Sequence, residues 1–267
     1  MTRIGQRFAE LRAKGEGALI AFVVAGDPDL PTSEQILQAL ADGGADIIEL
    51  GAPFSDPLAD GVVIQEASQR ALRHHTSLAD VLAMVRRFRQ QRETPLLIMT
   101  CCNLVLQFGL APFAREAKAA GLDGVLITDL PPEEADPWLA EARRQDLDTI
   151  FLLAPSSDRV RLSAIAARSR GFLYCVSRMG VTGAREALPA DLPDLIARAR
   201  AEARLPIAIG FGISTAEQVR QVCRLAEGAV VGSAIVRLIA EPGASPEAAA
   251  RVRAFVQELK AGTSTCA

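Results

Sequence analysis

The sequence predicts an α/β fold, a single (β/α)8 TIM barrel with an extra N-terminal helix, and one domain over residues 1–267. Short apolar runs alternate with longer helical patterns along the whole chain, which is typical of a parallel sheet with helical connections. The runs are apolar almost throughout, as expected of strands that are covered on both faces. Eight such units in 267 residues favour a closed barrel over an open doubly wound sheet.

The predicted elements follow one another in a regular order. The eight strands are expected at 19–26, 46–51, 95–101, 124–130, 149–155, 172–177, 206–212 and 228–234. Helical patterns lie between them, among others at 33–44, 78–91, 113–121, 133–145, 159–169, 192–203 and 216–228. Residues 1–15 predict a polar helix at the bottom of the barrel, and 245–262 predict a last outer helix. Ser214 with Glu217 fits a capping box, and Gly121 fits a helix C-terminus.

Composition excludes several classes of protein. The chain is 49% hydrophobic and carries a net charge of -3, so no basic field marks it as a nucleic-acid binder. The sequence has no apolar run long enough to span a bilayer, and we expect a cytoplasmic protein. The five cysteines and two adjacent histidines have no metal-ligand spacing, so no metal is expected.

Glu49 is a carboxylate inside an apolar strand. Side chains alternate along a strand, so Glu49 shares a face with Ile47 and points into the barrel if Ile48 and Leu50 pack against helices. Burial there raises the pKa of a carboxylate and suits it to proton transfer near neutral pH. A structural glutamate paired with an arginine fits the position equally well. By composition alone, Asp60 in the loop that follows fits a turn better than a catalytic role.

The C-terminal third of the chain carries three glycine loops. The segments 210–214 and 230–236 each run from a strand into a helix N-terminus, where exposed N–H groups favour anions. Loops after strands seven and eight are the usual phosphate site of a TIM barrel. The longer loop 177–185 predicts a mobile lid. Together these loops indicate a small phosphorylated ligand at the barrel mouth.

These segments, taken in order, resemble the tryptophan synthase alpha subunit family. The resemblance rests on FVVAGDP (22–28), ADIIELGAPFSDPLADG (45–61), SRMGVTGAR (177–185), GFGIS (210–214) and VVGSAIV (230–236). Of these, the ELGxPFSDPxADG pattern is the most specific. The resemblance implies a lyase that reversibly cleaves indole-3-glycerol phosphate to indole and glyceraldehyde 3-phosphate.

The resemblance also implies roles for individual residues. Glu49 matches the acid–base catalyst, and Asp60 matches the carboxylate that stabilises positive charge on the indole. Further positions match the substrate pocket (Phe22, Tyr174, Thr182, Phe211), the phosphate cradle (Gly183, Gly212, Gly232, Ser233) and the lid (Arg178, Thr182).

The family works with a partner. Resemblance implies an alpha-beta-beta-alpha tetramer in which indole passes through a tunnel to a beta subunit, with Pro53, Asp56 and Asn103 at the interface. No cofactor is expected in this chain, and pyridoxal phosphate is expected only in the beta subunit. A stand-alone lyase and a non-catalytic activating subunit are the alternatives. Cys101 departs from the family, which often has a tyrosine there, and we interpret it as a packing residue that loosens the local wall.

Overall fold

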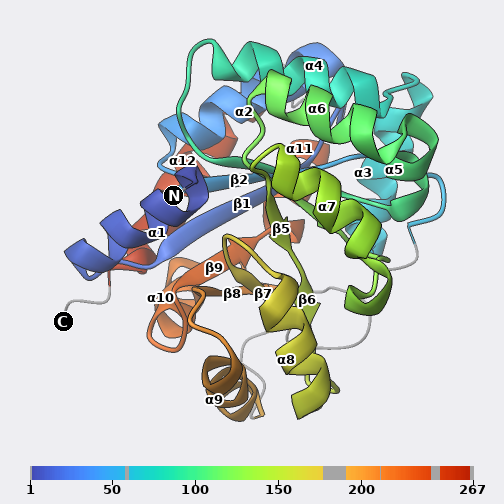
Figure 1. Ribbon diagram of the computed structural model, residues 1–267. Helices are drawn as coiled ribbons and strands as arrows, with labels where there is room; N and C mark the ends of the chain where they lie inside the picture. Colours follow the sequence, from blue (N-terminus) through green and yellow to red (C-terminus); the bar gives the residue numbers. More distant parts are fainter. Residues whose placement is uncertain (1, 58–59, 177–190, 211, 242–246, 265–267) are drawn as a thin grey trace.

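Nine parallel strands form the central sheet of the protein (Figure 1). The computed structural model describes residues 2–57, 60–176, 191–210, 212–241 and 247–264. The strands are β1 (Ala18–Val24), β2 (Ile47–Gly51), β3 (Leu96–Thr100), β4 (Gly124–Ile127), β5 (Asp148–Ile150), β6 (Leu152–Leu153), β7 (Leu173–Val176), β8 (Ile207–Gly210) and β9 (Gly228–Val231). Their order is β5-β4-β3-β2-β1-β9-β8-β7-β6. Because β1 pairs with both β2 and β9, and the two ends of the sheet follow one another in the chain, the sheet curls into a barrel.

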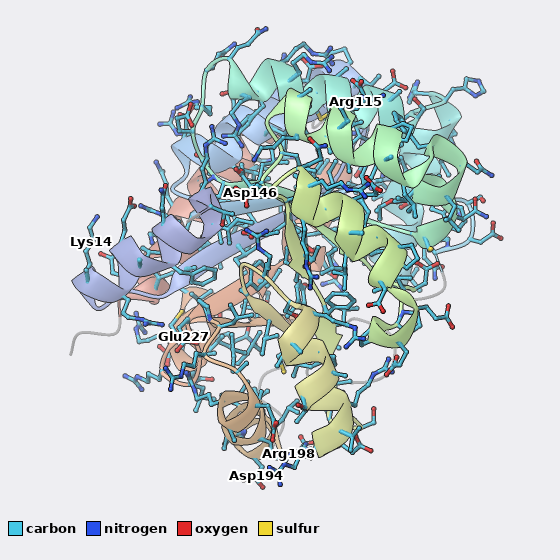
Figure 2. The ribbon with its side chains drawn as sticks, in the orientation of Figure 1. Lys14, Arg115, Asp146, Asp194, Arg198 and Glu227 are labelled. Carbon is cyan, nitrogen blue, oxygen red and sulfur yellow. The ribbon has the colours of Figure 1, made fainter. Side chains whose placement is uncertain are left out.

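Helices surround this sheet (Figure 1). They are α1 (Arg3–Lys14), α2 (Leu30–Asp42), α3 (Val62–Arg73), α4 (Leu78–Arg89), α5 (Cys102–Phe108), α6 (Leu110–Ala120), α7 (Asp136–Arg144), α8 (Arg159–Arg168), α9 (Leu192–Glu202), α10 (Ala216–Cys223), α11 (Ser233–Ala240) and α12 (Ala248–Lys260), with short 3-10 turns at Pro132–Glu134 and Ala261–Thr263. Charged side chains such as Lys14, Arg115 and Asp194 extend from their outer faces into solvent (Figure 2).

The predicted barrel is confirmed, with local differences. The fifth predicted strand is divided at Phe151 into β5 and β6, so the eight predicted strands become nine. Most strands also end earlier than predicted, because their last residues turn into the loops of the barrel mouth. The predicted capping box of Ser214 and Glu217 is wrong: Thr215 is the N-cap of α10, and its side chain accepts from the backbone N–H of Gln218, whereas the Gln218 side chain accepts from the backbone N–H of Ser214. Gly121 ends α6 with φ of 89°, as predicted.

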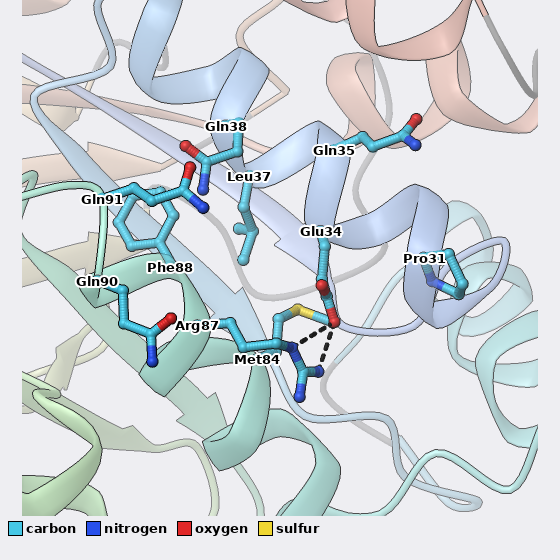
Figure 3. A pocket seen from close by; sticks show the side chains of 10 residues that line it. All are labelled: Pro31, Glu34, Gln35, Leu37, Gln38, Met84, Arg87, Phe88, Gln90 and Gln91. Atoms are coloured by element: carbon cyan, nitrogen blue, oxygen red, sulfur yellow. Dashed lines mark hydrogen bonds and ion pairs between the residues drawn. The ribbon is translucent and has the colours of Figure 1, made fainter.

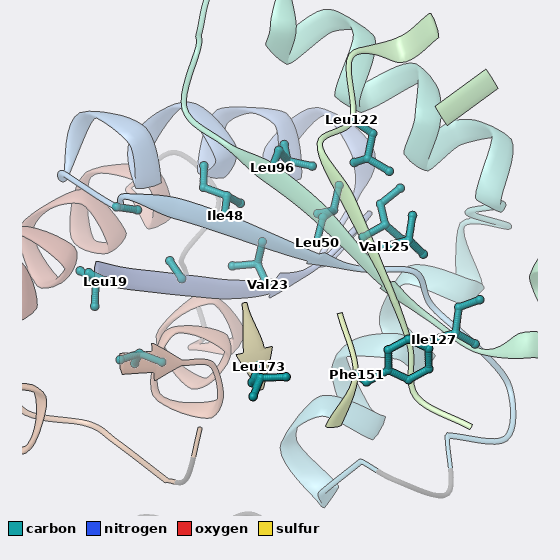
Figure 4. Close-up of a cluster of buried hydrophobic side chains, with 14 of the residues drawn as sticks. Leu19, Val23, Ile48, Leu50, Leu96, Leu122, Val125, Ile127, Phe151 and Leu173 are labelled. Carbon is teal, nitrogen blue, oxygen red and sulfur yellow. The ribbon is translucent and has the colours of Figure 1, made fainter. Parts of the chain in front are cut away.

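Two apolar layers face opposite sides of the sheet. The inner layer fills the barrel with side chains such as Ile20, Ile47 and Leu97, and the α1 residue Phe8 belongs to the same cluster. The outer layer lies between the sheet and the helices and includes Ile48, Leu50, Leu96 and Val125 (Figure 4). The alternation predicted for β2 is therefore confirmed, and it directs Glu49 inward with Ile47.

Buried aspartates fasten the bottom of the barrel. The carboxylate of Asp46, which precedes β2, accepts a hydrogen bond from the backbone N–H of Leu19 at 2.7 Å. The same carboxylate pairs with Arg7 of α1 at 2.6 Å and with Lys260 of α12 at 2.8 Å. Asp123, which precedes β4, pairs in the same way with Arg3 and accepts from the backbone N–H of Leu96. These bonds hold α1 across the end of the barrel opposite to the strand C-termini.

Replacing Asp46 with alanine should therefore destabilise the protein. The side chain of Asp46 is 0% exposed, and its loss would leave the N–H of Leu19 without a partner and remove the buried partner of two cations. We expect Asp46→Ala to lower the free energy of unfolding by about 3 kcal/mol, measured by urea denaturation. Asp42→Ala is the control, because Asp42 pairs with Arg92 at the surface with 39% of its side chain exposed, and its loss should cost less than about 1 kcal/mol. Equal losses for the two variants would contradict this role of Asp46.

Candidate active site

A cavity of about 140 Å³ opens at the C-terminal ends of the strands. Six residues that the sequence predicted for the site line it together: Phe22, Asp60, Tyr174, Gly212, Gly232 and Ser233. They come from β1, β7, the loop before α3, and the loops after β8 and β9. Phe211, Arg178, Thr182 and Gly183 lie outside the described residues. The described part of the predicted pocket and phosphate cradle is therefore assembled around one cavity.

Glu49 lies directly beside this cavity but is not part of its lining. In the sheet, Glu49 is paired in register with Phe22 on one side and with Leu97 on the other. Its side chain is 0% exposed, and among the described residues neither carboxylate oxygen has a hydrogen-bond partner. The alternative of a structural glutamate paired with an arginine therefore finds no support in the described part of the chain. An unpaired carboxyl group in an apolar interior is costly, which makes it a candidate for function.

Burial sets the protonation of the two carboxylates. Desolvation raises the pKa of Glu49 to about 8, and the charge of Asp60 adds to the shift. Desolvation also raises the pKa of Asp60, to about 6. At neutral pH, Glu49 is therefore largely a neutral acid, whereas Asp60 is largely ionised. Two carboxylates with separated pKa values are the arrangement expected for an acid–base catalyst beside a charge-stabilising group.

Three glycines leave room for the rings of Phe22 and Tyr174 to lie close to the neighbouring backbone. A Cβ atom on Gly210 would lie 2.8 Å from the hydroxyl of Tyr174, and one on Gly51 would lie 2.8 Å from the ring of Phe22. A Cβ atom on Gly232 would also approach Phe22, at 3.1 Å. A larger residue at any of these glycines would push an aromatic ring into the cavity. The glycines after the strands thus shape the pocket as well as the loops.

The N-terminus of α11 points to an anion site. Gly232 is its N-cap and makes no side-chain cap hydrogen bond, and Ser233 is its first residue. Backbone N–H groups at such an end favour an anion, because they lack intrahelical partners and lie at the positive end of the helix dipole. Both residues line the cavity, as does Gly212 in the loop after β8. A phosphate at this end would leave the apolar part of a ligand facing Phe22 and Asp60.

The sequence interpretation missed several apolar walls of the cavity. The additional lining residues are Ile64, Met99, Thr128, Leu152, Val176, Gly210, Ile213 and Val230. Some of these lining residues could have been predicted from the alternation of side chains along a strand, which also placed Glu49 inside the barrel. Met99 shares a strand face with Leu97, and Val230 shares one with Gly232. Thr128 and Leu152 could have been found in the same way, because they follow the inward-facing Leu126 and Ile150 by two positions in their predicted strands.

The predicted interface residues differ in exposure. Asp56 and Asn103 are exposed near the barrel mouth, whereas Pro53 is buried. Cys101 and Cys102 are both free thiols. Desolvation raises the pKa of Cys101 to about 11, so its thiol stays protonated at neutral pH. This agrees with a packing role for Cys101 and not with a nucleophile.

A second hollow lies between α2 and α4, away from the barrel mouth (Figure 3). It measures about 400 Å³ and is crossed by an ion pair between Glu34 and Arg87. The lining of this hollow contains neither Glu49 nor Asp60, and none of the glycine loops. Its larger volume therefore does not make it the better candidate for the active site. In the described ranges, no group of three or more His, Cys, Asp or Glu residues could hold a metal ion. Nor does any described helix have the length and apolarity to cross a membrane.

The raised pKa of Glu49 should appear in the pH dependence of stability. Between its ordinary value of 4.5 and about 8, the folded state binds a proton that the unfolded state has released. The free energy of unfolding therefore falls as pH rises, by up to about 1.4 kcal/mol per pH unit from this group. Glu49→Gln removes this loss, so its stability relative to the parent should grow through that window and level off above it.

Urea denaturation at about pH 5, 6, 7 and 8 measures the effect. Glu66→Gln, at an exposed position of α3, is the control and should differ from the parent by the same amount at each pH. A stability difference for Glu49→Gln that does not change with pH would contradict the raised pKa of Glu49.

Comparison with known proteins agrees with this geometry. Residues 8–264 match the model of the family described as tryptophan synthase alpha chain. The alpha chain of Geobacter sulfurreducens is 48% identical over 260 residues, 97% of this chain and 98% of that protein. A structure of Mycobacterium tuberculosis tryptophan synthase is 40% identical with a TM-score of 0.91 over 98% of each chain. The alpha subunit from Legionella pneumophila is 35% identical with a TM-score of 0.89 over 100% of each chain. This chain therefore belongs to the tryptophan synthase alpha chain family.

Proposed function

We propose that Glu49 and Asp60 carry out the alpha reaction of this family in the described cavity. That reaction is the reversible retro-aldol cleavage of indole-3-glycerol phosphate to indole and glyceraldehyde 3-phosphate, in tryptophan biosynthesis. The observation that supports the assignment most strongly is geometric: Glu49, buried without a hydrogen-bond partner among the described residues, and the half-buried Asp60 lie beside one cavity, where desolvation raises both pKa values. The anion site at the N-terminus of α11 adds a place for the substrate phosphate.

Glu49 acts as the proton donor and acceptor. Cleavage needs indole C3 to leave as a carbon group, which the intact aromatic ring resists. Protonation of C3 by neutral Glu49 converts the ring into an iminium-like leaving group. Glu49 then takes the proton from the adjacent glycerol hydroxyl, the C–C bond breaks, and its electron pair restores the aromatic indole. A carboxyl group near its pKa suits both transfers.

Asp60 stabilises the positive charge that develops on the indole nitrogen. An ionised carboxylate in a cavity with little water interacts strongly with such a charge. Phe22 and Tyr174 provide apolar walls for the indole, with Phe211 as a further predicted wall. In this proposal the phosphate binds at Gly212, Gly232 and Ser233 together with Gly183, and the lid residues Arg178 and Thr182 close over the ligand.

The chain also works with a tryptophan synthase beta subunit in this proposal. Asp56 and Asn103 are exposed at the barrel mouth and could contact such a partner. An alpha-beta-beta-alpha tetramer in the cytoplasm would pass indole directly to the beta subunit, whose pyridoxal phosphate is the cofactor of the second reaction. The alpha reaction needs no cofactor in this chain.

Changes at the two carboxylates test the catalytic roles. Glu49→Gln retains the shape of the side chain but cannot accept and return a proton, so turnover should fall by at least about 100-fold. Asp60→Asn should lower kcat by about 100-fold, because it removes the charge opposite the indole nitrogen. Steady-state indole release measures both, and circular dichroism checks the fold. Wild-type turnover by either variant would remove that residue from the mechanism.

Indole release with and without a beta subunit tests the partner proposal. Slow release by the chain alone and strong activation by a tryptophan synthase beta subunit is the expected result. Fast release that the beta subunit leaves unchanged would support a stand-alone lyase. No release under either condition would support a non-catalytic activating subunit.

A further inference from the structure

Helix α3 begins directly after the loop that carries Asp60. The helix starts with Gly61 as N-cap, and this end makes no side-chain cap hydrogen bond. The side chain of Gln65, one turn into α3, reaches back along the chain. Its Nε2 donates to the backbone carbonyl of Asp60 at 2.8 Å and also approaches the carbonyl of Pro57 at 3.5 Å. Because a carbonyl oxygen only accepts, this contact identifies the Gln65 atom as the amide nitrogen.

Packing holds the helix that carries Gln65 in place. Ile64 and Ala67 of α3 are buried against Phe22 and Val24 of β1. The first two turns of α3 therefore lie against the same strand that forms one wall of the cavity. Ile64 itself lines the cavity beside Asp60. A bond from this helix to Asp60 therefore connects the carboxylate's backbone to the wall of the pocket.

An ion pair fixes the same helix further along. Arg70 donates from Nε and Nη2 to the two carboxylate oxygens of Asp27, at 2.7 and 2.9 Å. Asp27 follows β1 and is only 1% exposed. Such a two-bond pair between arginine and a buried carboxylate has little rotational freedom. It limits sliding of α3 along the barrel, so Gln65 is presented to the loop from a rigid support.

We propose that Gln65 is a positioning residue for Asp60, which fixes the direction of the Asp60 carboxylate by holding its backbone carbonyl to α3. The proposal rests on the proposed role of Asp60 in charge stabilisation. Gln65 binds the backbone and leaves the carboxylate available to the substrate. A displacement of about 1 Å at a catalytic group can cost up to about 100-fold in rate, so one hydrogen bond at this place can act on turnover as well as on stability.

Gln65→Met tests the proposal, with Gln69→Met as its matched control. Methionine is similar to glutamine in length and helix propensity but donates no hydrogen bond. Gln69 lies on the same helix and is exposed. We expect Gln65→Met to lower kcat for indole release by about 10-fold while KM stays within about 2-fold, because the phosphate cradle is untouched. Gln69→Met should leave both constants unchanged.

Two further measurements separate positioning from simple stabilisation. Gln65→Lys retains a donor of similar reach and should recover most of the lost kcat. Urea denaturation should show that Gln65→Met remains fully folded under the assay conditions, so that the fall in kcat belongs to the folded enzyme. If kcat of Gln65→Met falls only in proportion to the fraction of the protein that is unfolded, the proposal is overturned.

The Asp60→Asn variant separates the proposed role of Asp60 from the proposed role of Gln65. If Asp60→Asn turns over at the wild-type rate, the proposed role of Asp60 fails and the role of Gln65 fails with it. If Asp60→Asn is slow but Gln65→Met behaves like Gln69→Met, only the positioning role of Gln65 is overturned. Slow turnover in both Asp60→Asn and Gln65→Met, with recovery by Gln65→Lys, supports it.

Discussion

The desolvation of the Glu49 carboxyl group is the constraint on which the site depends. Within the described residues its two oxygens have no hydrogen-bond partner, and its side chain is 0% exposed. Such a group avoids the large cost of a buried charge by holding its proton at neutral pH. The barrel makes this burial possible, because β1 and β3 flank Glu49 on both sides and place Phe22 and Leu97 beside it. The raised pKa of Glu49 is thus a consequence of where the fold places an ordinary glutamate.

The two ends of the barrel use carboxylates in opposite ways. At the bottom, Asp46 and Asp123 are buried but satisfied, each by arginine and by a backbone N–H of the neighbouring strand. At the top, Glu49 and Asp60 have pKa values raised by desolvation. Paired carboxylates strengthen the frame, whereas desolvation lets Glu49 keep its proton at neutral pH and leaves Asp60 largely ionised there. Ion pairs and raised pKa values thus belong to different carboxylates at opposite ends of the barrel.

Much of this could be predicted from the sequence, because it depends on local periodicity. Alternation along 46–51 was sufficient to place Glu49 inside the barrel, and glycines after the last two strands indicated the anion site. The division of the fifth strand at Phe151 was not predictable, since it depends on how the sheet closes between β5 and β6. The side-chain bond of Gln65 depends on the geometry of the α3 N-terminus, which composition does not reveal.

The two carboxylates are held in place by different parts of the fold. Glu49 is held by the sheet, where register with Phe22 and Leu97 leaves it little freedom. Asp60 lies in a loop, and loops are less precise supports than strands. Helix α3 gives this loop a second connection to rigid structure, through Gln65 and through the Arg70–Asp27 ion pair that holds the helix. The same loop carries the exposed Asp56. The barrel thus combines an acid fixed by the sheet with a charge whose position depends on a helix and a loop.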